Sequence, residues 1–198
     1  ANALNTAVGY DAGLLMTTGV RNVIIGGLAG DALTTSSGIT AVGYGALGAT
    51  TTGQFNTAVG FEALMTTVDG DNNTAVGYQA LRLFEYADAE GYNVAVGSTA
   101  LAALTTGVQN VVVGASAGVA MTTGSKNILM GQAGSALVEG SMNVAIGYRA
   151  LNTENAHGKN LAIGHEALLT LDAGADGYNI AIGHDAGKLM TTGSDNTI

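Results

Sequence analysis

The sequence contains no cysteine, no proline and no tryptophan among its 198 residues. The absence of cysteine excludes disulfide bonds and thiolate chemistry. The absence of proline, together with 31 glycines that do not recur at every third position, excludes a collagen triple helix. No apolar run approaches the roughly 20 residues that a membrane-spanning helix needs, so we expect no membrane insertion in this segment.

Charge is also scarce, since only 11% of the residues are charged, against about 25% in an ordinary soluble domain. The six Lys and Arg residues are scattered and are outnumbered by fifteen Asp and Glu, which gives a net charge of −9. This balance lacks the basic surface of a nucleic-acid-binding protein. The apolar share of 47% is too high for a disordered chain, so we expect an ordered fold.

The dominant feature that is present is a short internal repeat, seen in Asn56–Leu64 (NTAVGFEAL) and Asn73–Leu81 (NTAVGYQAL). Each copy contains one glycine that sets the register. These repeat glycines are Gly9, Gly26, Gly43, Gly60, Gly77, Gly97, Gly114, Gly131, Gly147, Gly164 and Gly183. Their successive separations are 17, 17, 17, 17, 20, 17, 17, 16, 17 and 19 residues. This period is too short for a two-helix repeat, which takes about 33 to 47 residues, and it favours coils of short β-segments.

The residues before each repeat glycine alternate as in a β-strand. The positions one and three before the glycine, such as Val59 and Thr57, are apolar or threonine and share one face. The position between them is mostly alanine: Ala7, Ala41, Ala58, Ala75, Ala95, Ala145, Ala162 and Ala181. A second alanine column follows the glycine by three: Ala12, Ala29, Ala46, Ala63, Ala80, Ala100, Ala117, Ala150, Ala167 and Ala186. We predict that the β-branched face fills the coil and that both alanine columns lie outside.

These patterns predict an all-β fold, a parallel β-roll or β-solenoid of about eleven 17-residue coils with two short β-segments each. Thr-Thr-Gly turns, as at 105–107, separate the segments. A third apolar column, which includes Val138, stands seven residues after the glycine. Residues 1–198 form a single repeat array with loop-like insertions at 83–93 and 169–179. Because the first and last copies resemble the others, we expect a fragment of a longer fibre chain.

An asparagine stands four residues before all repeat glycines but one, where Ile39 replaces it. In stacked coils these amides would lie above one another and bond their neighbours or the turn backbone. The predicted structural ladder consists of Asn5, Asn22, Asn56, Asn73, Asn93, Asn110, Asn127, Asn143, Asn160 and Asn179.

An outer stripe of alanine and glycine would be flat and apolar, and such patches usually mark interfaces. We therefore expect a homo-oligomer wound about this stripe, with three chains as the favoured number. The alternative is a monomeric solenoid that keeps its alanines inside and its threonines outside.

The copies NTAVGYDAG, NTAVGFEAL, NTAVGYQAL, NVAIGYRAL, NLAIGHEAL and NIAIGHDAG resemble the repeats of phage tail fibres and related bacterial surface proteins. They are also similar to the N-S-V-A-I-G repeats in the heads of trimeric autotransporter adhesins, which usually have a shorter coil. The resemblance covers essentially the whole chain. It implies a trimer of left-handed parallel β-rolls in an extracellular fibre on a virion or a bacterial surface, which binds a host or a substratum. It implies no catalytic residues.

Three short motifs resemble chemical sites but follow from the repeat. Residues 114–118 match the G-x-S-x-G nucleophile elbow, yet the position of Ser116 holds Glu62 or Gln79 in other coils. Residues 43–48 match G-x-G-x-x-G without a following helix pattern. The segment 69–73 is rich in Asp and Asn, but it lacks the loop of a calcium-binding EF-hand and is predicted to be a turn. We therefore expect no catalytic residue and no cofactor.

Two histidines, His165 and His184, occupy the same column in adjacent coils, beside Glu166 and Asp185. Stacking would place them about 5 Å apart, so they are weak candidates for a metal site. The same column holds Tyr and Phe elsewhere, so a surface ladder of flat rings is the favoured interpretation, and no metal is expected.

The two insertions are the places where recognition could occur, because loops on a rigid scaffold often carry binding residues. Both contain acidic residues and tyrosine. The candidate recognition residues are Tyr86, Asp88, Glu90, Tyr92, Asp172, Asp176 and Tyr178. The alternative is that both insertions are spacers.

We expect a non-enzymatic, extracellular structural or adhesive segment of a phage tail fibre or bacterial surface adhesin, with a cell-surface or glycan receptor as a possible partner. The second hypothesis is a stand-alone ice- or carbohydrate-binding β-solenoid, since regular threonine arrays can order water. The paired threonines weaken the ice-binding hypothesis, because adjacent residues of a strand face opposite ways.

Overall fold

The structure is a computed structural model that describes residues 3–85, 90–153 and 155–198. The described residues contain eleven three-residue β-strands and no helix. The strands are β1 (Thr6–Val8), β2 (Val23–Ile25), β3 (Thr40–Val42), β4 (Thr57–Val59), β5 (Thr74–Val76), β6 (Val94–Val96), β7 (Val111–Val113), β8 (Ile128–Met130), β9 (Val144–Ile146), β10 (Leu161–Ile163) and β11 (Ile180–Ile182). Each strand directly precedes a repeat glycine.

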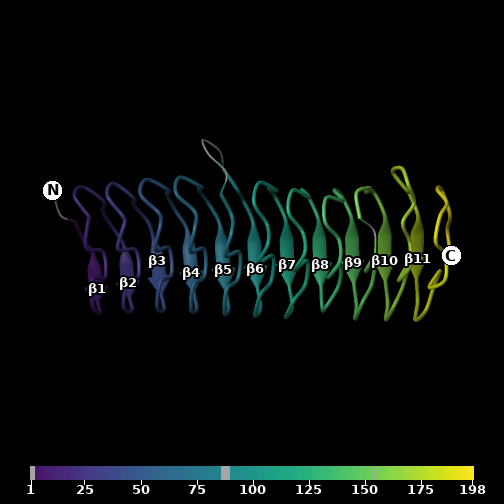
Figure 1. Ribbon diagram of the computed structural model, residues 1–198, viewed down its shortest axis with the longest axis horizontal. Coiled ribbons are helices and arrows are strands. Elements are labelled where there is room, and N and C mark those ends of the chain that lie inside the picture. Colours follow the sequence, from purple (N-terminus) through teal and green to yellow (C-terminus); the bar gives the residue numbers. More distant parts are fainter. Residues whose placement is uncertain (1–2, 86–89, 154) are drawn as a thin grey trace.

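All eleven strands form one parallel sheet in chain order, and Figure 1 shows them side by side along the longest axis. Equivalent repeat positions pair with each other, as in Thr57 with Thr74 and Val59 with Val76. The register is kept across the 20-residue interval, where Thr74 pairs with Val94. The prediction of an all-β solenoid of stacked 17-residue coils is therefore confirmed.

Among the described residues the rest of each coil consists of turns and irregular segments without a further strand, so the prediction of a second β-segment is wrong. Outside the shorter coil that follows Gly131, the residues two and four after the repeat glycine have positive φ, for example 53° at Glu62 and 50° at Leu64, which is incompatible with an extended strand. The turns still bond the neighbouring coils. The Glu62 N–H donates to the Tyr44 carbonyl at 2.9 Å, and the Leu64 N–H donates to the Ala80 carbonyl at 3.1 Å.

The strand faces are the reverse of those predicted. Ala41, Ala58 and Ala75 are fully buried, whereas Thr57 and Val59 on the other face are only partly buried. The second alanine column also faces the interior, and Ala63 is fully buried. The predicted outer alanine stripe therefore does not exist in the described coils. Only β1, in the first coil, has its alanine exposed.

The reason for the inward alanines is that the coil is narrow and a second side chain shares its interior with the strand. In six strands whose middle residue is alanine, as at Ala58, the buried turn position holds a leucine, here Leu64. The first and last strands differ, because β1 and β11 have alanine in the middle and glycine at the turn position, at Gly13 and Gly187. Where the middle residue is Leu129, the turn holds Gly134, and a Cβ there would meet Leu129 Cδ1 at 3.2 Å. Large and small side chains thus alternate between the two positions to fill one volume.

The third apolar column lies inside the coil, with Leu33, Phe84 and Leu104 fully buried. Buried Thr50 and Thr67 also occupy this column, and each donates its hydroxyl to a carbonyl of the next coil at 2.7 Å. Val138 is an exception in this column, since it is only partly buried and Leu137 is the fully buried residue there. That coil is one residue shorter, which shifts the inward position back by one.

The repeat glycines are required by close backbone approach. Gly60 has φ +140°, and a Cβ on it would lie 2.3 Å from the Gly77 carbonyl oxygen in the next coil. Any side chain there would collide with backbone, so only glycine permits the observed coil spacing.

Candidate functional site

One surface that runs along all eleven described strands is the outward side of the sheet, here called the outer strand face. It is formed by the first and third residues of each strand. They are Thr6, Val8, Val23, Ile25, Thr40, Val42, Thr57, Val59, Thr74, Val76, Val94, Val96, Val111, Val113, Ile128, Met130, Val144, Ile146, Leu161, Ile163, Ile180 and Ile182. All are apolar except four threonines. Ten strand spacings of about 4.8 Å make this face on the order of 50 Å long.

The predicted ladder asparagines stand in one file, and those from Asn22 to Asn179 are buried. Asn110 shows the pattern: its side-chain amide donates to Asn93 Oδ1 at 3.0 Å and to the Gly124 carbonyl at 2.9 Å. Its own Oδ1 accepts the backbone N–H of Asn127 at 2.9 Å. Asn110 therefore joins its coil to both neighbours while its buried polar atoms remain hydrogen-bonded. Asn56 follows Ile39 in the file, and its side chain bonds only the next coil, through the Gly70 carbonyl and the Asn73 backbone N–H.

A file of partly exposed rings follows the repeat glycines by one residue. Tyr44, Phe61 and Tyr78 stack in successive coils, with ring centroids 5.5 and 5.6 Å apart and planes 14° apart. A second stack consists of Tyr148, His165 and His184. The predicted ladder of flat rings is thus present in these two sections of the surface.

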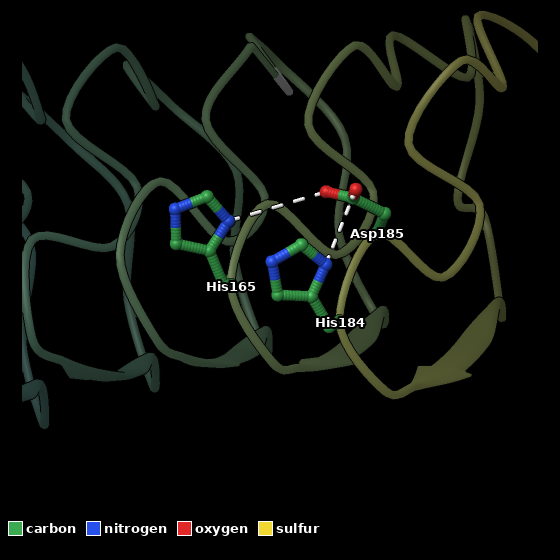
Figure 2. Close-up of side chains that lie close together, drawn as sticks. All are labelled: His165, His184 and Asp185. Atoms are coloured by element: carbon green, nitrogen blue, oxygen red, sulfur yellow. Dashed lines mark ion pairs between the residues drawn. The ribbon is translucent and has the colours of Figure 1, made fainter.

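The two histidines lie side by side with Asp185, as Figure 2 shows. The imidazole centroids are 4.7 Å apart and the ring planes differ by 5°. His184 Nδ1 lies 3.1 Å from one Asp185 carboxylate oxygen, and His165 Nδ1 lies 4.0 Å from the other. The ligand-type atoms of all three residues lie within 4.8 Å of one another. This is the group of described residues whose arrangement fits a metal ion.

Ion pairs surround the histidine pair. Lys188 Nζ lies 2.6 Å from Glu166 and 3.3 Å from Asp185, and Arg149 lies 3.2 Å from Glu166. The hydrogen bond from Lys188, followed by the charges of Lys188, His165 and Arg149, lowers the pKa of Glu166 despite its partial burial. Hydrogen bonds to Glu166 and Asp185 raise the pKa of Lys188. Both groups are therefore ionised at neutral pH.

In the first insertion the described candidates are Glu90 and Tyr92, which lie together. The hydrogen bond with the Glu90 carboxylate, and then desolvation, raises the pKa of the Tyr92 phenol. Asp71 pairs with Glu90 in an isolated parallel bridge, which attaches this end of the insertion to the preceding coil. Tyr86 and Asp88 lie outside the described residues.

In the second insertion, Asp176 and Tyr178 both contact Lys159, which is not one of the predicted recognition residues. Lys159 Nζ lies 2.6 Å from Asp176, 2.8 Å from the Tyr178 hydroxyl and 4.9 Å from the Tyr178 ring centroid. These contacts raise the pKa of Lys159 and lower that of Asp176. Lys159 and Tyr178 each directly precede a ladder asparagine, Asn160 and Asn179. Their shared position in the repeat therefore indicates that the two side chains lie next to each other in adjacent coils. Asp172 is exposed and does not join this group.

A notch interrupts the surface beside the first ring stack, where Gly45 and Gly48 stand in place of larger residues. It has a cavity volume of about 370 Å³ and is flanked by the carboxylates Asp31 and Glu62. Tyr44 borders it and is 51% exposed. Phe61 covers one face of the Tyr44 ring, while the preceding coil has Gly27 in the ring column. One face of Tyr44 is thus left without a stacked side chain.

The Thr-Thr-Gly turns do not form an open array of hydroxyls. Thr17 donates its hydroxyl to the Thr34 carbonyl at 2.9 Å, and Thr105 donates to the Thr122 carbonyl at 3.0 Å. These hydroxyls bind the next coil, so fewer donors are left for ordering water. The threonines on the outer strand face are a separate set and occupy only β1, β3, β4 and β5.

The other motifs are also used in coil-to-coil contacts. Asp71 in the acidic turn accepts the Gln54 backbone N–H at 2.6 Å, and Asp69 accepts the Thr52 hydroxyl at 2.5 Å. Ser116 lies 3.1 Å from the Thr99 hydroxyl of the preceding coil. These contacts support the interpretation of both motifs as parts of the repeat.

Comparison of the chain with protein-family models, curated proteins and solved structures finds no match. The described part of the chain also has no helix that is long and apolar enough to cross a membrane.

Proposed function

We propose that the chain is a non-enzymatic structural and adhesive segment of an extracellular fibre, of the phage tail fibre or bacterial surface adhesin type. The observation that carries this proposal is the unbroken sheet from β1 to β11, reinforced by buried asparagines that bond from coil to coil. Each coil contacts its neighbours through backbone bonds along its whole circuit, which makes the stack a rod. A rod of this kind transmits load and presents side chains at fixed spacing.

Self-association along the outer strand face is the second part of the proposal. This face is apolar and straight, and a stripe about 50 Å long and 10 Å wide covers roughly 500 Å². Contiguous apolar surface of this size usually marks an interaction site. The occupant we propose is a second and a third copy of the same chain, because equal coil spacing lets identical faces match along their whole length. The number three comes from the resemblance of the repeats.

The association is tested by placing a charge on this face. Val59→Lys with Val76→Lys should abolish the rise in melting temperature with protein concentration that an associating chain shows. Thr106→Lys, in an exposed Thr-Thr-Gly turn, is the control with the same kind of charge change and should keep that rise. A melting temperature of the unmodified chain that does not depend on concentration would contradict self-association.

Carbohydrate binding is a second candidate function, favoured by the notch at Tyr44. A bare aromatic face beside carboxylate acceptors suits a sugar ring, which offers apolar C–H groups on its face and hydroxyl donors at its edge. Gly45→Gln should fill the notch at a modest cost in backbone strain, because Gly45 has φ +63° and Gln79 occupies the same position with φ 51° in another coil. Glycan-array binding by the unmodified chain that disappears in this variant supports the function, and binding unaffected by the variant contradicts it.

A further inference from the structure

We propose that His165, His184 and Asp185 form a binding site for a divalent transition-metal ion such as Zn²⁺. Two imidazole nitrogens and a carboxylate oxygen are the donor set typical of zinc sites with three protein ligands and a bound water. In Figure 2 both Nδ1 atoms face the Asp185 carboxylate, at 3.1 and 4.0 Å. The three ligand-type atoms already lie within 4.8 Å of one another.

The solenoid itself holds these residues in place. The two histidines occupy the same column of adjacent coils, one residue after Gly164 and Gly183. The Asp185 backbone N–H donates to the His165 carbonyl at 2.9 Å, so the carboxylate is fixed relative to the neighbouring coil. Its φ of 58° is the left-handed conformation that this column shares in other coils. The backbone thus supplies the spacing before any metal binds.

Binding requires a small rearrangement that the surface permits. The rings are now parallel, and both nitrogens must turn toward one point to bind Zn²⁺ at about 2.0 to 2.1 Å. The His165 and His184 side chains are 45% and 68% exposed, so both have room to rotate. Each neutral ring must carry its proton on Nε2, so that Nδ1 offers its lone pair to the metal.

The neighbouring cation competes for Asp185 but has another partner. Lys188 pairs with Asp185 at 3.3 Å and more closely with Glu166 at 2.6 Å. When a metal takes the Asp185 oxygen, Lys188 keeps Glu166, which Arg149 also contacts. This exchange leaves no charged group unpaired, and it limits the affinity because the metal must displace an ion pair.

The alternative is that the two rings only continue the stack that begins at Tyr148. The repeat supplies a substitution that separates these roles, because tyrosine occurs in the same column of several coils. His165→Tyr with His184→Tyr keeps a stacked pair of rings and removes both nitrogen ligands. His157→Gln is the matched control, since it removes the third histidine of the chain and leaves the cluster intact.

The experiment is calorimetric titration of the folded chain with zinc sulfate, repeated with Co²⁺ to record its visible absorption bands. We expect one Zn²⁺ per chain, retention of binding in His157→Gln, and a loss of affinity of at least about tenfold in Asp185→Asn and in the double tyrosine variant. The Co²⁺ bands should disappear with the histidines. An unmodified chain that gives no heat, or a double tyrosine variant that binds like the unmodified chain, overturns the proposal.

Discussion

At the scale of single residues, two positions in each coil determine how closely the coils stack. The repeat glycine removes a side chain from the point where neighbouring backbones come together. The ladder asparagine fills the adjacent buried space with donors and acceptors that reach both neighbouring coils. Both effects depend on the presence of the next coil, so they contribute most inside the array.

Gly60→Ala should be more destabilising than Gly183→Ala. Both glycines have φ near +140°, so the backbone strain is similar, on the order of 1 to 3 kcal/mol. Only at Gly60 does the added Cβ meet backbone, 2.3 Å from the Gly77 oxygen, whereas its nearest contact at Gly183 is 3.9 Å. We expect an additional loss of about 2 kcal/mol for Gly60→Ala in urea unfolding. Equal losses would show that close approach is not the reason for the glycine.

Asn110→Ala should lower the free energy of unfolding by about 3 kcal/mol, because the Asn127 N–H and the Gly124 carbonyl lose their buried partner. Asn196→Ala is the control in the last described coil. Its amide donates to Asn179 and to Ser194, and its side chain is only partly buried. Chemical denaturation should show a smaller loss for the control, about 1 kcal/mol. A loss below that of the control would mean that the ladder does not stabilise the stack.

At the scale of the coil, the sequence predicts more about spacing than about orientation. The period of 17 and the three-residue strands follow directly from the glycine and β-branched columns. Alternation also shows which residues share a face, but both faces of these strands are apolar, so it does not show which face is inside. That choice depends on the volume left by Leu64 and its equivalents, which only the three-dimensional coil reveals. The second segment was mispredicted because positive φ at Glu62 and Leu64 is not evident from their residue types.

The shared interior volume predicts coupling between Ala58 and Leu64. Ala58→Leu alone should overfill the coil and cost about 1 to 3 kcal/mol, while Leu64→Gly alone should leave a cavity and cost about 3 kcal/mol. The double variant reproduces the arrangement of Leu129 with Gly134 and should recover at least about 1 kcal/mol relative to the sum of the single losses. Thermal unfolding of the unmodified chain, the two single variants and the double variant gives the free-energy losses to be compared. Additive losses would contradict the proposed sharing of the interior.

At the scale of the whole molecule, regular coils produce long surfaces of one kind with local exceptions. The outer strand face is uniform, which suits self-association. The exceptions are the Tyr44 notch, the Lys159 group and the histidine cluster, each formed where neighbouring coils differ. The histidine pair was evident from the sequence because its residues share a column. The notch was not, because it arises from side chains missing at Gly45 and Gly48.

The orientation of the strands also changes the basis of the oligomer hypothesis. The repeat pattern predicted an interface on the alanine columns, which the structure buries inside the coils. The proposed interface now consists of the β-branched residues on the outer strand face, such as Val59 and Val76. These side chains offer more apolar area than alanine, which strengthens the physical argument for association.

Association of the rod through its outer strand face can be measured by sedimentation equilibrium of the unmodified chain over a range of concentrations. We expect a mass of two or more chains of 19.6 kDa, and of three chains if the resemblance to trimeric fibres extends to assembly. The same measurement on Val59→Lys with Val76→Lys should return the mass of one chain with an unchanged circular dichroism spectrum. A mass of 19.6 kDa for the unmodified chain at the highest soluble concentration would contradict the account.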